Sequence, residues 1–185
     1  MQKNSLFSSP SRCFMMFGKI VAAAGVAVLA VMAATAPADA QAVKRLGQFA
    51  DWEAFSYAGK TGVVCYATTQ PKRSLGAPKG RGAAYLSVTH RPRDKSFGVL
   101  SAASGVDLRK DGAAEVDIGG ARFEMFTSGD TAWARNDSAV LQAMSKGREM
   151  IVSTTPAKGA ALSDTYSLVG FSQAFAEIGK ACGVK

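Results

Sequence analysis

An uncharged apolar run near the N-terminus determines the compartment in which this chain is expected to fold. Residues 20–36 (IVAAAGVAVLAVMAATA) follow Lys19 directly, and Ala38-Asp39-Ala40 supplies the small residues that a signal peptidase requires. We therefore expect residues 1–40 to be a signal peptide that signal peptidase cleaves between Ala40 and Gln41 during export. The alternative is an uncleaved membrane anchor, because a run of 17 residues lies at the lower limit for a spanning helix.

Two cysteines, Cys65 and Cys182, lie beyond the leader. Residues 41–185 number 145, which is enough for one domain with a sizeable core. In an oxidising compartment, two lone thiols in one domain predict one disulfide. It would span 117 positions, and the chain-entropy model gives at most about 4.9 kcal/mol for such a loop. The alternative is two unpaired buried thiols. A redox-active pair is disfavoured because the chain has no Cys-x-x-Cys motif.

Short segments rich in β-branched and aromatic residues, separated by Gly, Pro, Asn and Asp, predict a mainly β fold. We expect a small β-sandwich or meander domain with a short helix and an amphipathic C-terminal helix packed on the sheet. Gly119-Gly120 predicts a two-residue hairpin turn, because both glycines accept positive φ angles. The expected strands are 48–57 (with a bulge), 62–69, 84–90, 97–102, 116–118, 121–126, 131–135, 149–154 and 165–168.

Two helices are expected to interrupt this pattern. Asp137 can cap a short helix that ends at Lys146-Gly147. The second helix closes the chain, and its apolar residues recur at helical spacing. These residues are Phe171, Ala174, Phe175, Ile178, Ala181 and Cys182. Cys182 is therefore expected on the buried side of the last helix, facing the sheet that carries Cys65.

The residues that could support catalysis are few. His90 is the only histidine, and its place at a strand end predicts a surface residue; no Gly-x-Ser-x-Gly elbow presents a nucleophile. One histidine and two bridged cysteines cannot form a tetrahedral zinc site. We therefore expect no catalytic residue, no metal and no cofactor. Trp52 and Trp133 could form an aromatic platform for sugars, but their alternating strand positions favour core roles.

The positive charge is concentrated in one stretch. Residues 41–185 carry 19 basic and 13 acidic residues, a net charge of +6, and residues 71–95 account for all of it with seven basic residues against Asp94. This stretch can simply be two exposed basic loops that favour solubility. It can also be a contact surface for an anionic partner, such as lipopolysaccharide phosphates or sulfated glycans of a host surface. The candidate anion-binding residues are Lys72, Arg73, Lys79, Arg81, Arg91, Arg93 and Lys95.

Geometry limits this hypothesis. The two basic loops flank the expected strand 84–90, which is roughly 20 Å long at about 3.3 Å per residue. They form one patch only if the loop 71–82 folds back along the sheet. No nucleic-acid partner is expected.

Several short motifs resemble the invasion-associated locus B family in their order and spacing. They are Asp51-Trp52, Cys65-Tyr66-Ala67 followed by Gln70-Pro71, Ala132-Trp133, Lys146-Gly147-Arg148-Glu149, and Thr165-Tyr166-Ser167-Leu168-Val169-Gly170-Phe171 before a helix that finishes at Cys182. The resemblance covers roughly residues 49–182. It implies a secreted or periplasmic β-sandwich-like domain of Gram-negative bacteria, and it brings no established catalytic residues.

Two functions follow as hypotheses. The favoured one is a non-enzymatic protein of the family, located in the periplasm or secreted to the outer surface, which binds an envelope or host-surface component. The alternative is a periplasmic hydrolase or other enzyme of unknown substrate. A cluster of Ser, His90 and an acid would favour the enzyme, whereas a flat cationic surface without a deep pocket would favour binding.

Overall fold

The computed structural model describes residues 42–184. The expected signal peptide and its cleavage site between Ala40 and Gln41 lie outside the described residues. Within the described part, no helix combines the length and apolar character needed to cross a membrane.

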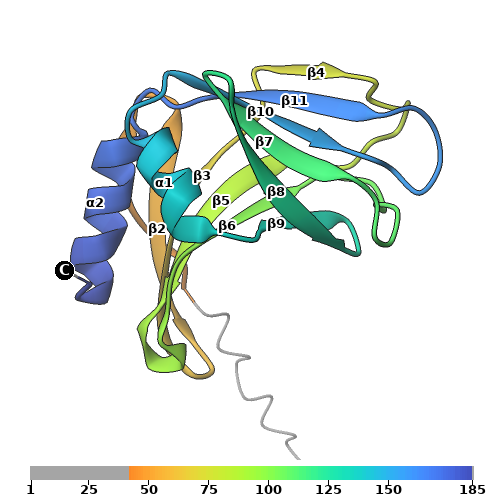
Figure 1. Cartoon of the computed structure of the whole chain (residues 1–185). Helices are drawn as coiled ribbons and strands as arrows, with labels where there is room; N and C mark the ends of the chain where they lie inside the picture. Colours follow the sequence, from red (N-terminus) through yellow and green to blue (C-terminus); the bar gives the residue numbers. More distant parts are fainter. Residues whose placement is uncertain (1–41, 185) are drawn as a thin grey trace, which may run out of the picture. The chain divides into compact units, whose positions relative to one another are not determined.

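The described residues form eleven strands and two α-helices (Figure 1). The strands are β1 (Lys44–Phe49), β2 (Trp52–Gly59), β3 (Gly62–Thr69), β4 (Arg73–Leu75), β5 (Tyr85–Arg91), β6 (Ser96–Ala103), β7 (Ala114–Ile118), β8 (Ala121–Ser128), β9 (Thr131–Ala134), β10 (Glu149–Thr154) and β11 (Leu162–Ser167). The helices are α1 (Asp137–Met144) and α2 (Phe171–Cys182), with a 3-10 turn, η1 (Pro92–Asp94), between β5 and β6. The mainly β fold with a short helix and a C-terminal helix is confirmed.

All strands belong to one antiparallel sheet in the order β1-β2-β3-β5-β6-β9-β8-β7-β10-β11-β4. The sheet bends strongly, so that β2 and β3 run upright in Figure 1 while β4, β10 and β11 lie across the top. One hydrophobic core contains residues of both halves, including Trp52 and Leu86 from one and Val116 and Tyr166 from the other. The bend allows a single sheet to enclose a core as the two layers of a sandwich do.

The hairpins follow the turn residues closely. Gly119 and Gly120 have φ angles of 60° and 89°, and Ile118 pairs with Ala121 across them, as expected for the two-residue turn. The expectation of one bulged strand over 48–57 is wrong. Ala50, at φ 49°, and Asp51 form a turn there, and the segment is split between β1 and β2. The short strand β4 was not expected, because its pairing with β11 is set by residues about 90 positions away.

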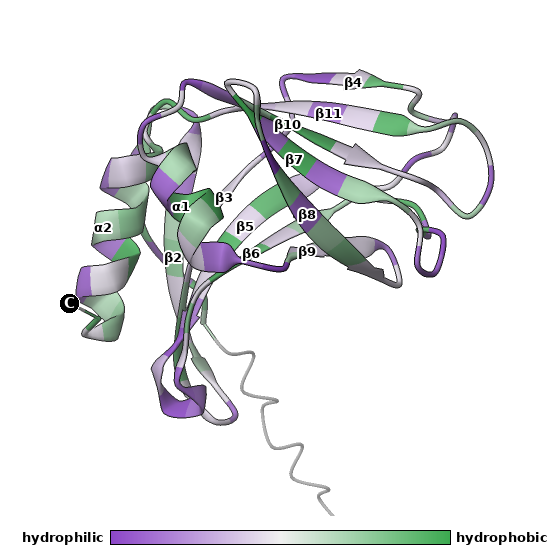
Figure 2. Ribbon diagram, in the orientation of Figure 1, coloured by the Kyte–Doolittle hydropathy of each residue, from purple (hydrophilic) through white to green (hydrophobic). Residues whose placement is uncertain are grey.

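The helix ends differ slightly from expectation. The cap of α1 is Asn136, whose side-chain oxygen accepts a hydrogen bond from the Ala139 amide at 3.1 Å. The Asp137 carboxylate instead accepts from the Leu100 amide at 2.8 Å, which ties α1 to β6. In α2 the predicted stripe is buried at Phe171, Ala174, Ile178 and Cys182, whereas Ala181 is exposed. Figure 2 shows this alternation of hydrophobic and hydrophilic residues along the helix.

The predicted disulfide is present. Cys65 in β3 and Cys182 at the end of α2 are bonded, with their Cα atoms 6.0 Å apart and 117 positions between them. Both residues are buried. The bridge fixes the end of α2 to the centre of the sheet half formed by β1, β2, β3 and β5.

Candidate binding site

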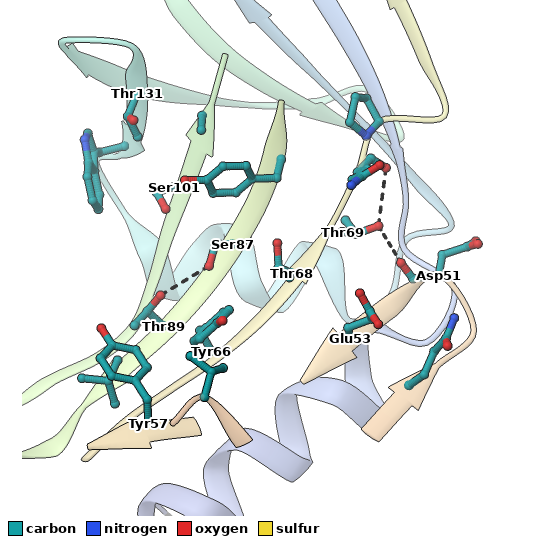
Figure 3. A pocket seen from close by; sticks show the side chains of 18 of the residues that line it. Asp51, Glu53, Tyr57, Tyr66, Thr68, Thr69, Ser87, Thr89, Ser101 and Thr131 are labelled. Carbon is teal, nitrogen blue, oxygen red and sulfur yellow. Dashed lines mark hydrogen bonds between the residues drawn. The ribbon is translucent and has the colours of Figure 1, made fainter. Parts of the chain in front are cut away.

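A groove lies on the face of the sheet opposite Cys65 and α2. Side chains alternate between the two faces of a strand, so Cys65 and Ala67 of β3 face the core while Tyr66 and Thr68 face the groove. The same alternation directs Ser87 of β5 into it. The groove has a volume of about 1090 Å³ and runs over β2, β3, β5, β6 and β9. Figure 3 shows its side chains in front of the sheet.

Aromatic rings form much of the groove lining. Tyr57, Tyr66, Tyr85 and Trp133 all contribute side chains. The ring of Tyr66 stacks on Phe55, with centroids 5.2 Å apart, and meets the edge of Tyr57 at 6.2 Å. Burial raises the pKa of the Tyr66 hydroxyl above its usual value. These contacts fix the orientation of the Tyr66 ring.

Hydroxyl groups line the groove between the rings. Ser87 and Thr89 of β5 are buried at its floor, with their side-chain oxygens 3.4 Å apart. Thr68 donates to the Leu86 carbonyl at 2.8 Å and keeps its oxygen lone pairs available. Ser101 and Thr131 extend this set over β6 and β9 (Figure 3). The middle of the groove is thus uncharged but rich in hydrogen-bonding groups.

Charged residues lie at the margins. Asp51 accepts from Lys72 at 2.6 Å, and this hydrogen bond holds the pKa of the Asp51 carboxyl below its usual value. Glu53 is paired with Arg45. Arg91, at the end of β5, also lines the groove and forms no ion pair within the described residues. The one lining charge without an opposite partner in this part of the chain is therefore positive.

The family model "Invasion associated locus B (IalB) protein" matches residues 52–179, which is most of the described part. The chain belongs to the invasion associated locus B family. A crystal structure of invasion associated protein B from Bartonella henselae has the same fold: its TM-score is 0.54 at 18% sequence identity, covering 73% of this chain and 96% of that one. No curated protein matches the chain. The resemblance seen in the sequence motifs is confirmed.

The histidine of this family member does not reach the groove. His90 is 2% exposed and faces the core, where it packs against Phe175 with ring centroids 5.2 Å apart. Its Nδ1 accepts a hydrogen bond from the Gly98 amide at 3.0 Å. Burial lowers the pKa of the imidazole. The expectation of a surface histidine is therefore wrong, because the strand continues through residue 91 and α2 covers its inner face.

The seven candidate anion-binding residues do not form one patch. Lys72, Arg73, Lys79 and Arg81 lie on the segment around β4, which pairs with β11 instead of folding back along β5. Arg91, Arg93 and Lys95 lie at the end of β5 and in the β5–β6 connection. This connection is at the bottom of Figure 1, whereas β4 is at the top. Figure 2 shows the hydrophilic character of that connection. Arg81 is largely buried against Asp164 and is unavailable to a ligand.

The two tryptophans lie in different environments, one in the core and one in the groove. Trp52 is fully buried, packs on Phe171 and donates to the Ser167 carbonyl at 2.9 Å, so its core role is confirmed. Trp133 is only partly buried and lines the groove, so its expected core role is wrong. The signal for the groove was present in the sequence. Most outward positions of β3, β5 and β9 hold aromatic or hydroxyl residues, where a plain solvent-facing strand would carry several charges.

Proposed function

We propose that this chain is an exported, non-enzymatic binding protein of the bacterial envelope or outer surface, and that it holds its ligand in the groove. The observation that carries the proposal is the groove itself. Its volume of about 1090 Å³ is slightly above the range of about 300–1,000 Å³ that is typical of ligand sites. Its lining of rings and hydroxyl groups is suited to binding by packing and hydrogen bonds.

The placement of the titratable groups favours binding over hydrolysis. A serine or threonine nucleophile needs a base within hydrogen-bond reach. The hydroxyl oxygens of Ser87 and Thr89 are within 3.4 Å of each other, and His90 lies on the opposite face of the sheet, where it accepts from the Gly98 amide. The marginal carboxylates Asp51 and Glu53 are engaged by Lys72 and Arg45. The groove therefore lacks an arrangement that would activate a hydroxyl within the described residues.

Export is supported by the leader pattern and by the disulfide, since such bridges persist in oxidising compartments. Protein expressed from the full sequence and recovered from the periplasm is expected to begin at Gln41. Intact-mass measurement checks this. Retention of residues 1–40 in the membrane fraction would contradict export as a released protein.

Filling the groove tests the binding role. Ser101→Trp places a large ring among the lining side chains, and Ser172→Trp places the same ring on the exposed side of α2. Both variants are expressed from the full chain and compared for binding to bacterial outer-membrane vesicles and to cultured host-cell surfaces. We expect the wild type and Ser172→Trp to bind at least one surface, and Ser101→Trp to bind at least tenfold more weakly. Equal binding by both variants, or no wild-type binding to either surface, would contradict the proposal.

A further inference from the structure

We propose that the groove binds an acidic glycan, whose sugar rings pack on the aromatic side chains while an anionic substituent pairs with Arg91. The inference rests on the proposed binding function and names the class of ligand. A sugar ring has an apolar face of C–H groups and a rim of hydroxyls. The groove presents the matching pair of surfaces, because rings such as Tyr66 and Trp133 alternate with hydroxyl side chains across four strands.

The hydroxyl lining argues against a lipid tail. An aliphatic chain would remove the partly exposed hydroxyls of Thr68, Ser101 and Thr131 from water without offering them hydrogen bonds. A sugar hydroxyl can both donate and accept, as the lining hydroxyls do, so each contact can be satisfied in either direction. Thr68 already donates to the Leu86 carbonyl, which leaves it as an acceptor for a ligand hydroxyl.

The sheet topology argues against a peptide strand. Peptides commonly bind to sheets by adding a strand to an open edge. The groove lies over β3, β5 and β6, and each of these strands is paired on both sides. Their backbone groups are therefore used within the sheet. A ligand that lies over these three strands therefore meets their side chains and not their backbone, which suits a chain of sugar rings.

The distribution of charge around the groove indicates that the bound glycan carries an acidic group. At one margin the carboxylates of Asp51 and Glu53 are neutralised by Lys72 and Arg45. Arg91 lines the groove without an ion pair in the described part of the chain. An arginine forms paired hydrogen bonds with carboxylate, sulfate or phosphate. Such a group, carried on a sugar, would pair with Arg91 at this end of the groove.

Matched variants distinguish binding at a specific site from a general effect of the protein's net charge. Arg91→Gln removes the charge that lines the groove, whereas Arg93→Gln removes an equal charge that lies outside the groove lining. Trp133→Ala removes a groove ring, and Phe97→Ala removes a half-exposed ring from the opposite face, beside His90. The full-chain protein is titrated with hyaluronan, which carries carboxylates only, with heparin, which carries sulfates and carboxylates, and with neutral dextran.

We expect hyaluronan or heparin to bind at least tenfold more tightly than dextran. Arg91→Gln is expected to weaken that binding about tenfold or more, since charge-assisted hydrogen bonds are lost. Trp133→Ala is expected to weaken it about tenfold. Arg93→Gln and Phe97→Ala should stay within about twofold of the wild type, and thermal melts confirm folding of all four variants. Binding of hyaluronan about as tightly as heparin would show that a carboxylate is sufficient, whereas binding of heparin alone would identify sulfate as the required group.

Equal losses from Arg91→Gln and Arg93→Gln would mean that net charge alone was measured, and would overturn the proposal. Absence of binding to both acidic glycans, or equal affinity for dextran, would also overturn it. These failures are distinct from failure of the binding function. If Ser101→Trp still abolishes attachment to vesicles or cells, the groove binds a ligand of another class.

Discussion

The guanidinium of Arg81 and the carboxylate of Asp164 form a two-pronged ion pair in a largely buried site. The Nη1–Oδ1 and Nη2–Oδ2 distances are 2.9 and 2.5 Å, and the side chains are 9% and 5% exposed. Ser74 also hydrogen-bonds Oδ1 of Asp164, and Nε of Arg81 donates to the Ser104 carbonyl. The pair therefore joins the segment after β4 to β11 and to the end of β6.

Removing one member of this pair is expected to be costly. Arg81→Met leaves the Asp164 carboxylate buried without its partner, and the expected loss of unfolding free energy is about 3–5 kcal/mol. The double variant Arg81→Met/Asp164→Leu should lose clearly less than the sum of the two single variants, because no charge is left buried. Urea unfolding of all three measures this. Additive losses would show that the two side chains stabilise the fold independently.

Loss of the Cys65–Cys182 bridge is expected to lower stability by about 2–4 kcal/mol, because the unfolded chain is freed of a long closed loop. Cys182→Ser and reduction of the wild type should give similar melting temperatures. Intact-mass measurement should show an oxidised form about 2 Da lighter than the reduced form, and alkylation should label the two cysteines only after reduction. Free thiols in the exported protein would contradict the bridge.

Stability is expected to fall as the pH drops through the His90 titration. Burial lowers the His90 pKa in the folded state, so below the usual value near 6.5 the unfolded chain binds a proton that the folded chain does not. The associated stability is therefore complete above pH 6.5 and is lost as the pH falls toward the folded pKa. Melting temperatures of the wild type and His90→Gln between pH 5 and 8 test this. A wild-type decline no steeper than that of His90→Gln would rule out His90 as the cause.

Gly170 is expected to tolerate no side chain. Its φ is 93°, and an added Cβ would lie 1.9 Å from the Phe49 carbonyl oxygen. Gly129 also has a positive φ, of 62°, but open space surrounds it. Gly129→Ala should cost about 1–2 kcal/mol for the left-handed backbone alone. Gly170→Ala should cost about 1–3 kcal/mol more, because the β1–β2 turn must move. Equal losses of unfolding free energy in Gly170→Ala and Gly129→Ala, measured by denaturant unfolding, would show that the β1–β2 turn moves without an energetic cost.

Local sequence patterns were sufficient to predict most of the strands and both helices. The Gly119-Gly120 turn, the strand 62–69 and the helix stripe ending at Cys182 depend on neighbours in sequence, so alternation and helical spacing could predict them. The family could be recognised for the same reason, since its motifs are short and ordered. The disulfide followed from cysteine number and compartment, because only two thiols remain after the leader.

Only the tertiary structure determined which strand faces line the groove and which pack in the core. Which face of β5 or β9 is buried depends on where α2 and the other half of the sheet come to lie, and alternation cannot decide this. That is why His90 was placed outside and Trp133 inside, the reverse of what is found. The Arg81–Asp164 pair joins residues 83 positions apart, so a basic loop in the sequence contains a structural ion pair in the fold. Sequence determines the periodicity of each strand, whereas packing determines which of its two faces meets solvent.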